Sequence, residues 1–391
     1  MDTTLIESEI LPQNCDSAVL VGRVWSNERK GPCPILVDNN LLHDLTSFSP
    51  TLAGLLEITD LNQVLSNASD TPILGQLDEF LPNRDGKGSA GYLLAPCDLQ
   101  PIKAAGVTFV DSILERLIEE ECKGDSRKSK IIRARLTSIV GENVRGVKPA
   151  SEKAASIKTL LQEQGLWSQY LEVGIGPHAE IFSKAPPMAS VGLGHEIGIR
   201  SDSDWNNPEP EIVLAISSKG NIVGATLGND VNLRDFEGRS ALLLNIAKDN
   251  NASCSIGPFI RLFDPKFGLD DVVNMQIKLC VIGDDGYEVV GINKMSKISR
   301  NPQDLVAQLL NQNHQYPDGV MLFLGTMFVP TKDRDGPNSG FTHKIGDRVQ
   351  VSAPELGCLT NWVNYCENIP PWNYGLRSLF EHLAHSYQAK R

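Results

Sequence analysis

Three carboxylate side chains near the middle of the chain have the chemical type and the spacing to hold a metal ion. Residues 205–211 read Trp-Asn-Asn-Pro-Glu-Pro-Glu, and an apolar run at 212–216 follows directly. Glu209 and Glu211 are two residues apart, and the prolines before and between them favour an extended backbone. Both side chains therefore point to one face of a strand. Two carboxylates on one face repel each other unless they are solvated or share a cation.

The next turn supplies the third carboxylate. Ser218-Lys219-Gly220 predicts a turn between the apolar run and the strand-like residues 221–227. A simple hairpin centred near Lys219 places Asn229 or Asp230 opposite Glu209. Three carboxylates on a rigid frame suit Mg²⁺ or Mn²⁺, and no His or Cys has the spacing of zinc ligands. The alternative is that the two glutamates are exposed charges at a strand start and that Asp230 caps the following helix.

The composition excludes several classes of function. The chain has 391 residues and a formal net charge of -12, from 36 Lys and Arg against 48 Asp and Glu. Its most basic segment, 123–135, is interleaved with apolar residues at helical spacing, so we interpret it as a solvated helix face rather than a nucleic-acid site. The longest apolar stretch, 320–329, is about half the length that spans a bilayer. Because residues 1–11 also lack the apolar segment of a signal peptide, we expect a soluble cytoplasmic protein without nucleic-acid or membrane partners.

The elements that must position these carboxylates fall into two regions. The first 165 residues mix short strands with helices, and residues from 171 onward are mainly strand-like runs separated by Gly, Pro and Asn. The predicted helices are at 102–121, 126–140, 149–165 and 302–311, with a short one after Asp230. The predicted strands are at 17–25, 34–37, 211–217, 222–227, 272–282, 320–324 and 348–352. We therefore predict a β-rich α+β fold, with a mixed α/β N-terminal domain at 1–165 and a catalytic domain at 166–391.

A series of motifs in the second half resembles the fumarylacetoacetate hydrolase family. The motifs, in order, are Pro-Glu-Pro-Glu at 208–211, Gly-Asn-Asp-Val-Asn-Leu-Arg-Asp at 228–235, Lys248 with Ile-Gly-Pro-Phe at 256–259, Gly325-Thr326, Ile-Gly-Asp-Arg-Val at 345–349 and Leu-Gly-Cys-Leu-Thr-Asn at 356–361. The resemblance implies a catalytic domain of mixed β-sheet or β-roll type. It also implies a tendency to form homodimers or homotetramers.

The resemblance also implies roles for individual residues. The metal ligands would be Glu209, Glu211 and Asp230, which would hold Mg²⁺ or Mn²⁺. The catalytic residues would be Glu180 and Lys248, with Lys248 as a base or an electrostatic stabiliser near a 2-keto acid substrate. Candidates for contact with the substrate are Lys184, Arg200, Ser201, Arg234 and Thr326. For Arg234 the alternative is an internal salt bridge with Asp235 or Glu237.

The family includes C–C bond hydrolases, decarboxylases and sugar-acid dehydratases, and two departures disfavour hydrolysis. Hydrolases that resemble acylpyruvases carry an H-x-x-E motif on a lid. We take residues 174–184 as the corresponding stretch, and there His178 and Glu180 are only two residues apart. Many of the larger hydrolases also have glutamine three residues after the arginine of the N-D motif, where this chain has Glu237.

Residues 180–184 and 195–205 are instead similar to the family's bacterial 2-keto-3-deoxy-D-pentonate dehydratases, as are 94–96 and 102–109. The resemblance implies a Mg²⁺-dependent lyase of pentose catabolism, which converts the acid derived from D-xylonate or D-arabinonate into 2-oxoglutarate semialdehyde. Lys248, with a lowered pKa, would take the C3 proton, and Glu180 would protonate the departing C4 hydroxyl, although their roles can be exchanged. The alternatives are a C–C bond hydrolase of an acylpyruvate or fumarylacetoacetate-like diketone, and a metal-dependent binding protein without catalysis.

Overall fold

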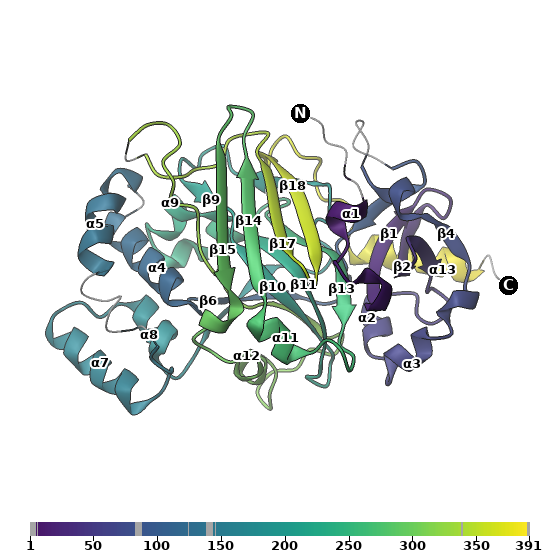
Figure 1. The fold of residues 1–391 in the computed structure, drawn as a ribbon, viewed down its shortest axis with the longest axis horizontal. Helices are drawn as coiled ribbons and strands as arrows, with labels where there is room; N and C mark the ends of the chain where they lie inside the picture. Colours follow the sequence, from purple (N-terminus) through teal and green to yellow (C-terminus); the bar gives the residue numbers. More distant parts are fainter. Residues whose placement is uncertain are drawn as a thin grey trace.

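The computed structural model describes residues 5, 7–82, 88–123, 125–137, 144, 146–337 and 339–388. An 11-stranded sheet runs through the molecule in the order β4-β3-β2-β1-β13-β11-β10-β16-β6-β7, with β5 paired to β1 (Figure 1). Its strands are β1 (Leu20–Ser26), β2 (Gly31–Asp38), β3 (Leu41–Asp44), β4 (Ile73–Gln76), β5 (Gly91–Leu94), β6 (Ile102–Gly106), β7 (Glu180–Ala185), β10 (Pro210–Ile216), β11 (Ile222–Asp230), β13 (Cys254–Leu262) and β16 (Val320–Phe323).

A second, five-stranded sheet packs against the first. Its order is β15 (Glu288–Lys294), β14 (Gln276–Ile282), β17 (Arg348–Ala353), β18 (Gly357–Tyr365) and β8 (Glu196–Ile199). Buried side chains of both sheets share one core, for example Ile212 and Leu227 from the large sheet with Leu279 and Val351 from the small one. A two-stranded pair, β9 (Asn206–Asn207) with β12 (Asn232–Leu233), lies beside them. The predicted β-rich α+β fold is confirmed.

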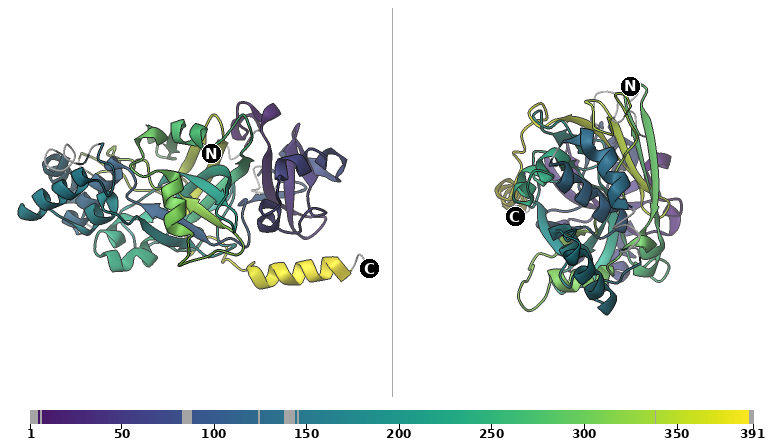
Figure 2. Two further views of the ribbon diagram at one scale, coloured as in Figure 1. Left: turned by 90° about the horizontal axis from the view of Figure 1, so that it is seen from below. Right: turned by 90° about the vertical axis from the view of Figure 1, so that its left-hand side faces the viewer.

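Helices gather mainly at the ends of the large sheet. They are α1 (Glu7–Ile10), α2 (Leu52–Leu56), α3 (Leu61–Leu65), α4 (Val110–Cys122), α5 (Ser129–Leu136), α7 (Glu152–Glu163), α8 (Gln169–Ile175), α9 (Arg234–Glu237), α10 (Leu244–Lys248), α11 (Leu269–Asn274), α12 (Pro302–Leu309) and α13 (Leu376–Gln388). Helices α4, α5, α7 and α8 form a group at one end, and α13 lies along the N-terminal strands at the other (Figures 1 and 2). None of the helices in the described ranges is long and apolar enough to cross a membrane.

The large sheet joins segments from both predicted domains. Strand β6 pairs in parallel with β16, and β1 pairs antiparallel with β13. The chain before residue 165 thus supplies strands to the same sheet as the chain after it. The division into two domains at residue 165 stays a prediction.

Two predicted elements differ from the structure. Residues 102–106 form strand β6 rather than the start of a helix, because β16 and β7 pair with this segment on its two sides. A short apolar run is compatible with either element, and tertiary pairing decided the outcome. The predicted strand 272–282 begins only at Gln276, because residues 269–274 form α11. Residues 138–140 of the predicted helix 126–140 lie outside the described residues.

Candidate metal and active site

The β10–β11 hairpin brings the three predicted carboxylates together. Glu211 pairs with Gly228 across the hairpin, and the backbone amide of Asp230 donates to the carbonyl of Glu209 at 3.0 Å. Asp230 therefore lies opposite Glu209, as the hairpin prediction required. One oxygen from each of Glu209, Glu211 and Asp230 lies within 4.8 Å of the others, and each residue is only 1% exposed. An all-oxygen, anionic and buried donor set of this kind fits a hard divalent cation such as Mg²⁺.

The alternative interpretation of these carboxylates is wrong. Both glutamates are buried rather than exposed at a strand start. Helix α9 begins at Arg234 with Leu233 at its N-cap, so Asp230 does not cap it.

Gly325 and Thr326 hold the two glutamates from the end of β16. The amide of Gly325 donates to Glu211 Oε2 at 2.7 Å, and Thr326 Oγ1 lies 2.7 Å from Glu209 Oε2 and 3.1 Å from Glu211 Oε1. Position 325 requires glycine, because its φ is +103° and a Cβ there would lie 1.9 Å from Thr108 Oγ1. The predicted substrate residue Thr326 thus contacts two of the predicted metal ligands directly.

Two buried lysines contact the same carboxylates. Lys248 Nζ lies 2.5 Å from Glu209 Oε2 and 3.0 Å from Asp230 Oδ2. Lys184 Nζ lies 2.7 Å from Asp230 Oδ1, and it also donates to the carbonyls of Val231, at 3.1 Å, and Lys248. Two of the three N–H donors of Lys184 thus bind backbone carbonyls, and its charge pairs with Asp230. Lys184 contacts Asp230 and the backbone, and its predicted contact with the substrate stays a prediction.

Burial and neighbouring charges shift the pKa values of the clustered residues in different directions. Burial raises the pKa of Glu211, and Asp230 and Glu209 raise it further, to well above its ordinary value. Burial also acts to raise the pKa of Glu209, but Arg116 and Lys248 outweigh it and bring that pKa to about 2. Burial alone would lower the pKa of Lys248, but Asp230, Glu209 and Glu237 raise it above its ordinary value. We had predicted a lowered pKa for Lys248, from burial and a nearby cation, whereas the carboxylates that pair with its ammonium group act in the opposite direction.

Glu180, the first residue of β7, lies close to this cluster. It pairs with Gly106 of β6, and a Cβ on Gly106 would lie 2.0 Å from Glu180 Oε2, so the carboxyl group rests directly over that glycine. Burial raises the pKa of Glu180; Glu209 and Asp230 act in the same direction, while Arg116 and Lys248 oppose it. Glu180 thus interacts electrostatically with Lys248 and with two of the three carboxylates.

The structure does not bring Arg200 and Ser201 to this site. Arg200 forms an ion pair with Asp202, with the Nη2–Oδ2 distance at 2.7 Å, and Ser201 Oγ donates to Glu367 Oε1 at 2.8 Å. Ser201 and both acidic partners are exposed. Within the described residues, the hydrogen bonds and ion pairs of Arg200 and Ser201 are with these surface groups.

Arg234 points away from the three carboxylates. Its Nη2 lies 2.8 Å from Glu115 Oε2 and its Nε lies 2.6 Å from Glu119 Oε1. Arg234 thus makes internal salt bridges, but its partners belong to α4 rather than being Asp235 or Glu237, the two we had predicted.

Comparison with known proteins gives the same assignment as the motifs. The profile described as Fumarylacetoacetate (FAA) hydrolase C-terminal matches residues 158–364, which is more than half of the chain. This chain belongs to the fumarylacetoacetate hydrolase family.

Two curated family members are similar in sequence. One, from Saccharolobus solfataricus, is described as 2-dehydro-3-deoxy-D-arabinonate dehydratase and is 34% identical over 46% of this chain and 57% of its own length. The other, from Haloferax volcanii, is described as a probable 2-keto-3-deoxyxylonate dehydratase and is 31% identical over 52% of this chain and 66% of its own length. The chain therefore matches less than two thirds of the length of either relative.

Solved structures show the same fold over most of the chain. A 2-keto-3-deoxy-D-arabinonate dehydratase complexed with magnesium and 2,5-dioxopentanoate superposes with a TM-score of 0.56. The superposition covers 88% of this chain and 99% of that one, at 20% identity. The family fold is thus present outside the segment that the profile matches.

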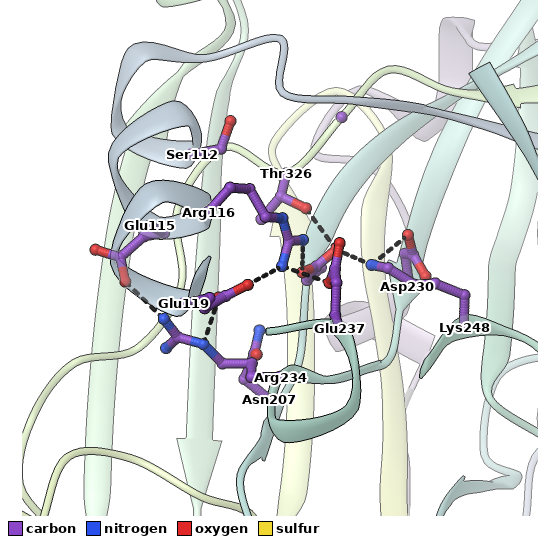
Figure 3. Close-up of polar contacts among 12 residues, drawn as sticks. Ser112, Glu115, Arg116, Glu119, Asn207, Asp230, Arg234, Glu237, Lys248 and Thr326 are labelled. Carbon is purple, nitrogen blue, oxygen red and sulfur yellow. Dashed lines mark hydrogen bonds and ion pairs between the residues drawn. The ribbon is translucent and has the colours of Figure 1, made fainter. Parts of the chain in front are cut away.

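The sequence analysis missed an arginine that contacts one of the three carboxylates of this family member. Arg116 of α4 lies outside the matched segment, yet its Nη2 is 2.5 Å from Glu209 Oε1. Its Nη1 is 2.7 Å from Glu119 Oε2 and 2.6 Å from Glu237 Oε2 (Figure 3).

A pattern in the sequence could have found Arg116. Ser112, Glu115, Arg116 and Glu119 follow the spacing i, i+3, i+4, i+7, which places them on one face of a helix. We had predicted only that this segment, within residues 102–121, is helical. All four residues are buried, so α4 carries a second, polar face that packs inside the protein.

Proposed function

We propose that this protein is a Mg²⁺-dependent dehydratase that converts a 2-keto-3-deoxy-D-pentonate into 2-oxoglutarate semialdehyde. The observation that carries the proposal is the placement of two proton-transfer groups, Glu180 and Lys248, beside three buried carboxylates. The descriptions of the two curated relatives and of the magnesium-bound neighbour support it.

Glu209, Glu211 and Asp230 would hold the cation, with Thr326 and Gly325 fixing the glutamates. A bound Mg²⁺ would supply Lewis-acid stabilisation of the negative charge that develops on the 2-keto oxygen of the substrate. Lys184 pairs its charge with Asp230 while two of its N–H groups bind the backbone, so we propose it as a positioning residue.

Lys248 is the proposed acceptor of the C3 proton. Its ammonium group pairs with Glu209 and Asp230, and those carboxylates raise its pKa. Positive charge bound to the same carboxylates would oppose that effect and release the lysine as a neutral base. Lys248 would therefore serve as the base only when Glu209 and Asp230 bind another positive charge.

Glu180 is the proposed donor of a proton to the departing C4 hydroxyl. Burial raises its pKa, so its protonated form persists to higher pH than that of an ordinary glutamate. His178 and Glu180 are only two residues apart, and this departure from the H-x-x-E spacing disfavours water activation by a His–Glu pair and hence hydrolysis. Loss of the C3 proton and the C4 hydroxyl removes one water, and a later proton shift from C5 gives the aldehyde.

The test is to incubate the Mg²⁺-loaded protein with 2-keto-3-deoxy-D-xylonate and to follow semialdehyde formation. EDTA treatment and Glu209→Gln serve as controls for the metal, and Glu180→Gln for the proton donor. Metal-dependent semialdehyde formation would support the proposal. No turnover of this acid, together with pyruvate release from an acylpyruvate, would refute it in favour of C–C bond hydrolysis.

We further propose that the enzyme acts in the cytoplasm, in pentose catabolism, as a homodimer or homotetramer. The sequence motifs and the described relatives support this setting. Measurement of the solution mass by light scattering would test the oligomeric state.

A further inference from the structure

Helix α4 contributes to the metal site from outside the segment that defines the family. The profile match begins at residue 158, whereas α4 spans Val110–Cys122. Its apolar face, including Ile113, Leu117 and Ile118, packs in a cluster with α7 and α8. On its polar face Arg116 pairs with Glu119 of the same helix and with Glu237 of α9 (Figure 3).

The two carboxylate oxygens of Glu209 contact different partners, and Arg116 contacts one of them. Its Nη2 takes Oε1 at 2.5 Å, while Lys248 and Thr326 take Oε2 at 2.5 and 2.7 Å. The guanidinium group is planar and rigid, so its other nitrogen fixes its plane against Glu119 and Glu237. Glu209 is therefore held at both oxygens.

The other two ligands are held by groups within the family segment. Glu211 accepts from the Gly325 amide, and Asp230 contacts Lys184. Among the described contacts of the three ligands, Arg116 is the partner that comes from before residue 158.

A continuous chain of ion pairs holds Arg116 itself. Glu119 also accepts from Arg234 at 2.6 Å, Arg234 pairs with Glu115 at 2.8 Å, and Arg133 of α5 donates to Glu115. Arg133 is at the outer end, with 34% of its side chain exposed, and it does not contact Glu209 in the described structure. The network thus runs from the surface of α5 to a metal ligand through α4 and α9.

We propose that Arg116 is a positioning residue for the metal ligand Glu209, so that docking of α4 on α9 completes the metal site. The proposal rests on the proposed function only in that the three carboxylates bind a divalent cation. Residues that orient metal ligands typically contribute about 10–100-fold to metal affinity, and Arg116 contacts Glu209 in this way.

The test is to titrate the substrate-free protein with Mn²⁺ and to measure binding by electron paramagnetic resonance. The variants are R116M, R116K and, as the matched control, R133M, which removes an arginine of the same network without touching Glu209. We expect R116M to bind Mn²⁺ about 10–100-fold more weakly. R116K should show a smaller loss, because lysine lacks the planar fork, and R133M should bind like wild type.

Three results would overturn the proposal: unchanged or tighter binding by R116M, equal losses in R116M and R133M, or no Mn²⁺ binding by the wild type. Equal losses would mean that the network only stabilises the fold. Thermal unfolding of each variant gives its folded fraction. If R116M does not fold, R116K is compared with R133M instead. Because no substrate is present, failure of the dehydratase assay leaves this result intact.

Discussion

Replacing Gly106 by alanine should remove Glu180 from its place without altering Glu180 itself. A Cβ at position 106 would lie 2.0 Å from Glu180 Oε2 and 2.6 Å from its Cδ. Real Cβ atoms do not approach so closely, so the carboxyl group must turn away. The obstacle is the far end of a flexible side chain, and alanine fits the extended backbone of β6, where glycine costs about 0.5–1 kcal/mol relative to alanine. Stability should therefore change little.

Activity should fall steeply in Gly106→Ala. General acid–base catalysis typically contributes 10²–10⁴-fold, so a displaced donor should raise the barrier by about 3–5 kcal/mol. The assay is semialdehyde formation under saturating Mg²⁺, compared with Glu180→Gln. Gly268→Ala is the matched control, because a Cβ at that position meets nothing within 4 Å.

Two results would refute this reasoning. Full activity of Gly106→Ala beside an inactive Glu180→Gln would show that the carboxyl group need not rest over Gly106. A large loss of stability or of Mn²⁺ affinity in Gly106→Ala would show that the effect spreads beyond Glu180.

Three further predictions concern the buried charges. Metal affinity should rise with pH, because the raised pKa of Glu211 means that a cation must displace a proton, and calorimetric Mg²⁺ titrations at several pH values would show this. Lys184→Met should destabilise the protein by about 3–5 kcal/mol in urea unfolding, because it leaves Asp230 with one buried cation fewer. Glu237 has its pKa raised to about 7 by burial, so the free energy of unfolding should fall by about 3 kcal/mol as pH rises from the unfolded-state pKa of about 4.5 to 7.

The sign of the last prediction follows from proton binding. Because the pKa of Glu237 is higher in the folded than in the unfolded state, the folded protein binds more protons between these two pKa values. The free energy of unfolding is therefore highest below the unfolded-state pKa and falls as pH rises through the folded-state pKa. Glu237→Gln should flatten the dependence of the unfolding free energy on pH, and an unchanged dependence in this variant would contradict the raised pKa of Glu237.

A Mg²⁺ affinity that does not change with pH would contradict the raised pKa of Glu211. For Lys184→Met, a loss below about 1 kcal/mol would show that the buried pair is dispensable.

The sequence by itself determined the cluster of three carboxylates, because that cluster is local. Alternation along one strand places Glu209 and Glu211 on one face, and counting across a single turn places Asp230 opposite. The motifs around Lys248 and Thr326 resembled a known family closely enough to join them to the same site. These inferences depend on short spacings or on fixed motifs, which can be read without knowing how distant segments pack.

Tertiary structure alone decided which groups surround the cluster. Arg116 is 93 residues before Glu209 in the chain, and helical spacing shows that it shares a face with Glu119 but not what that face packs against. Residues 102–106 became a strand for the same reason, since β16 and β7 lie on either side of them. The pKa of Lys248 rose because its nearest neighbours are carboxylates. Local pattern limits what each segment can form, whereas long-range contacts set the charge and the partners of each buried group.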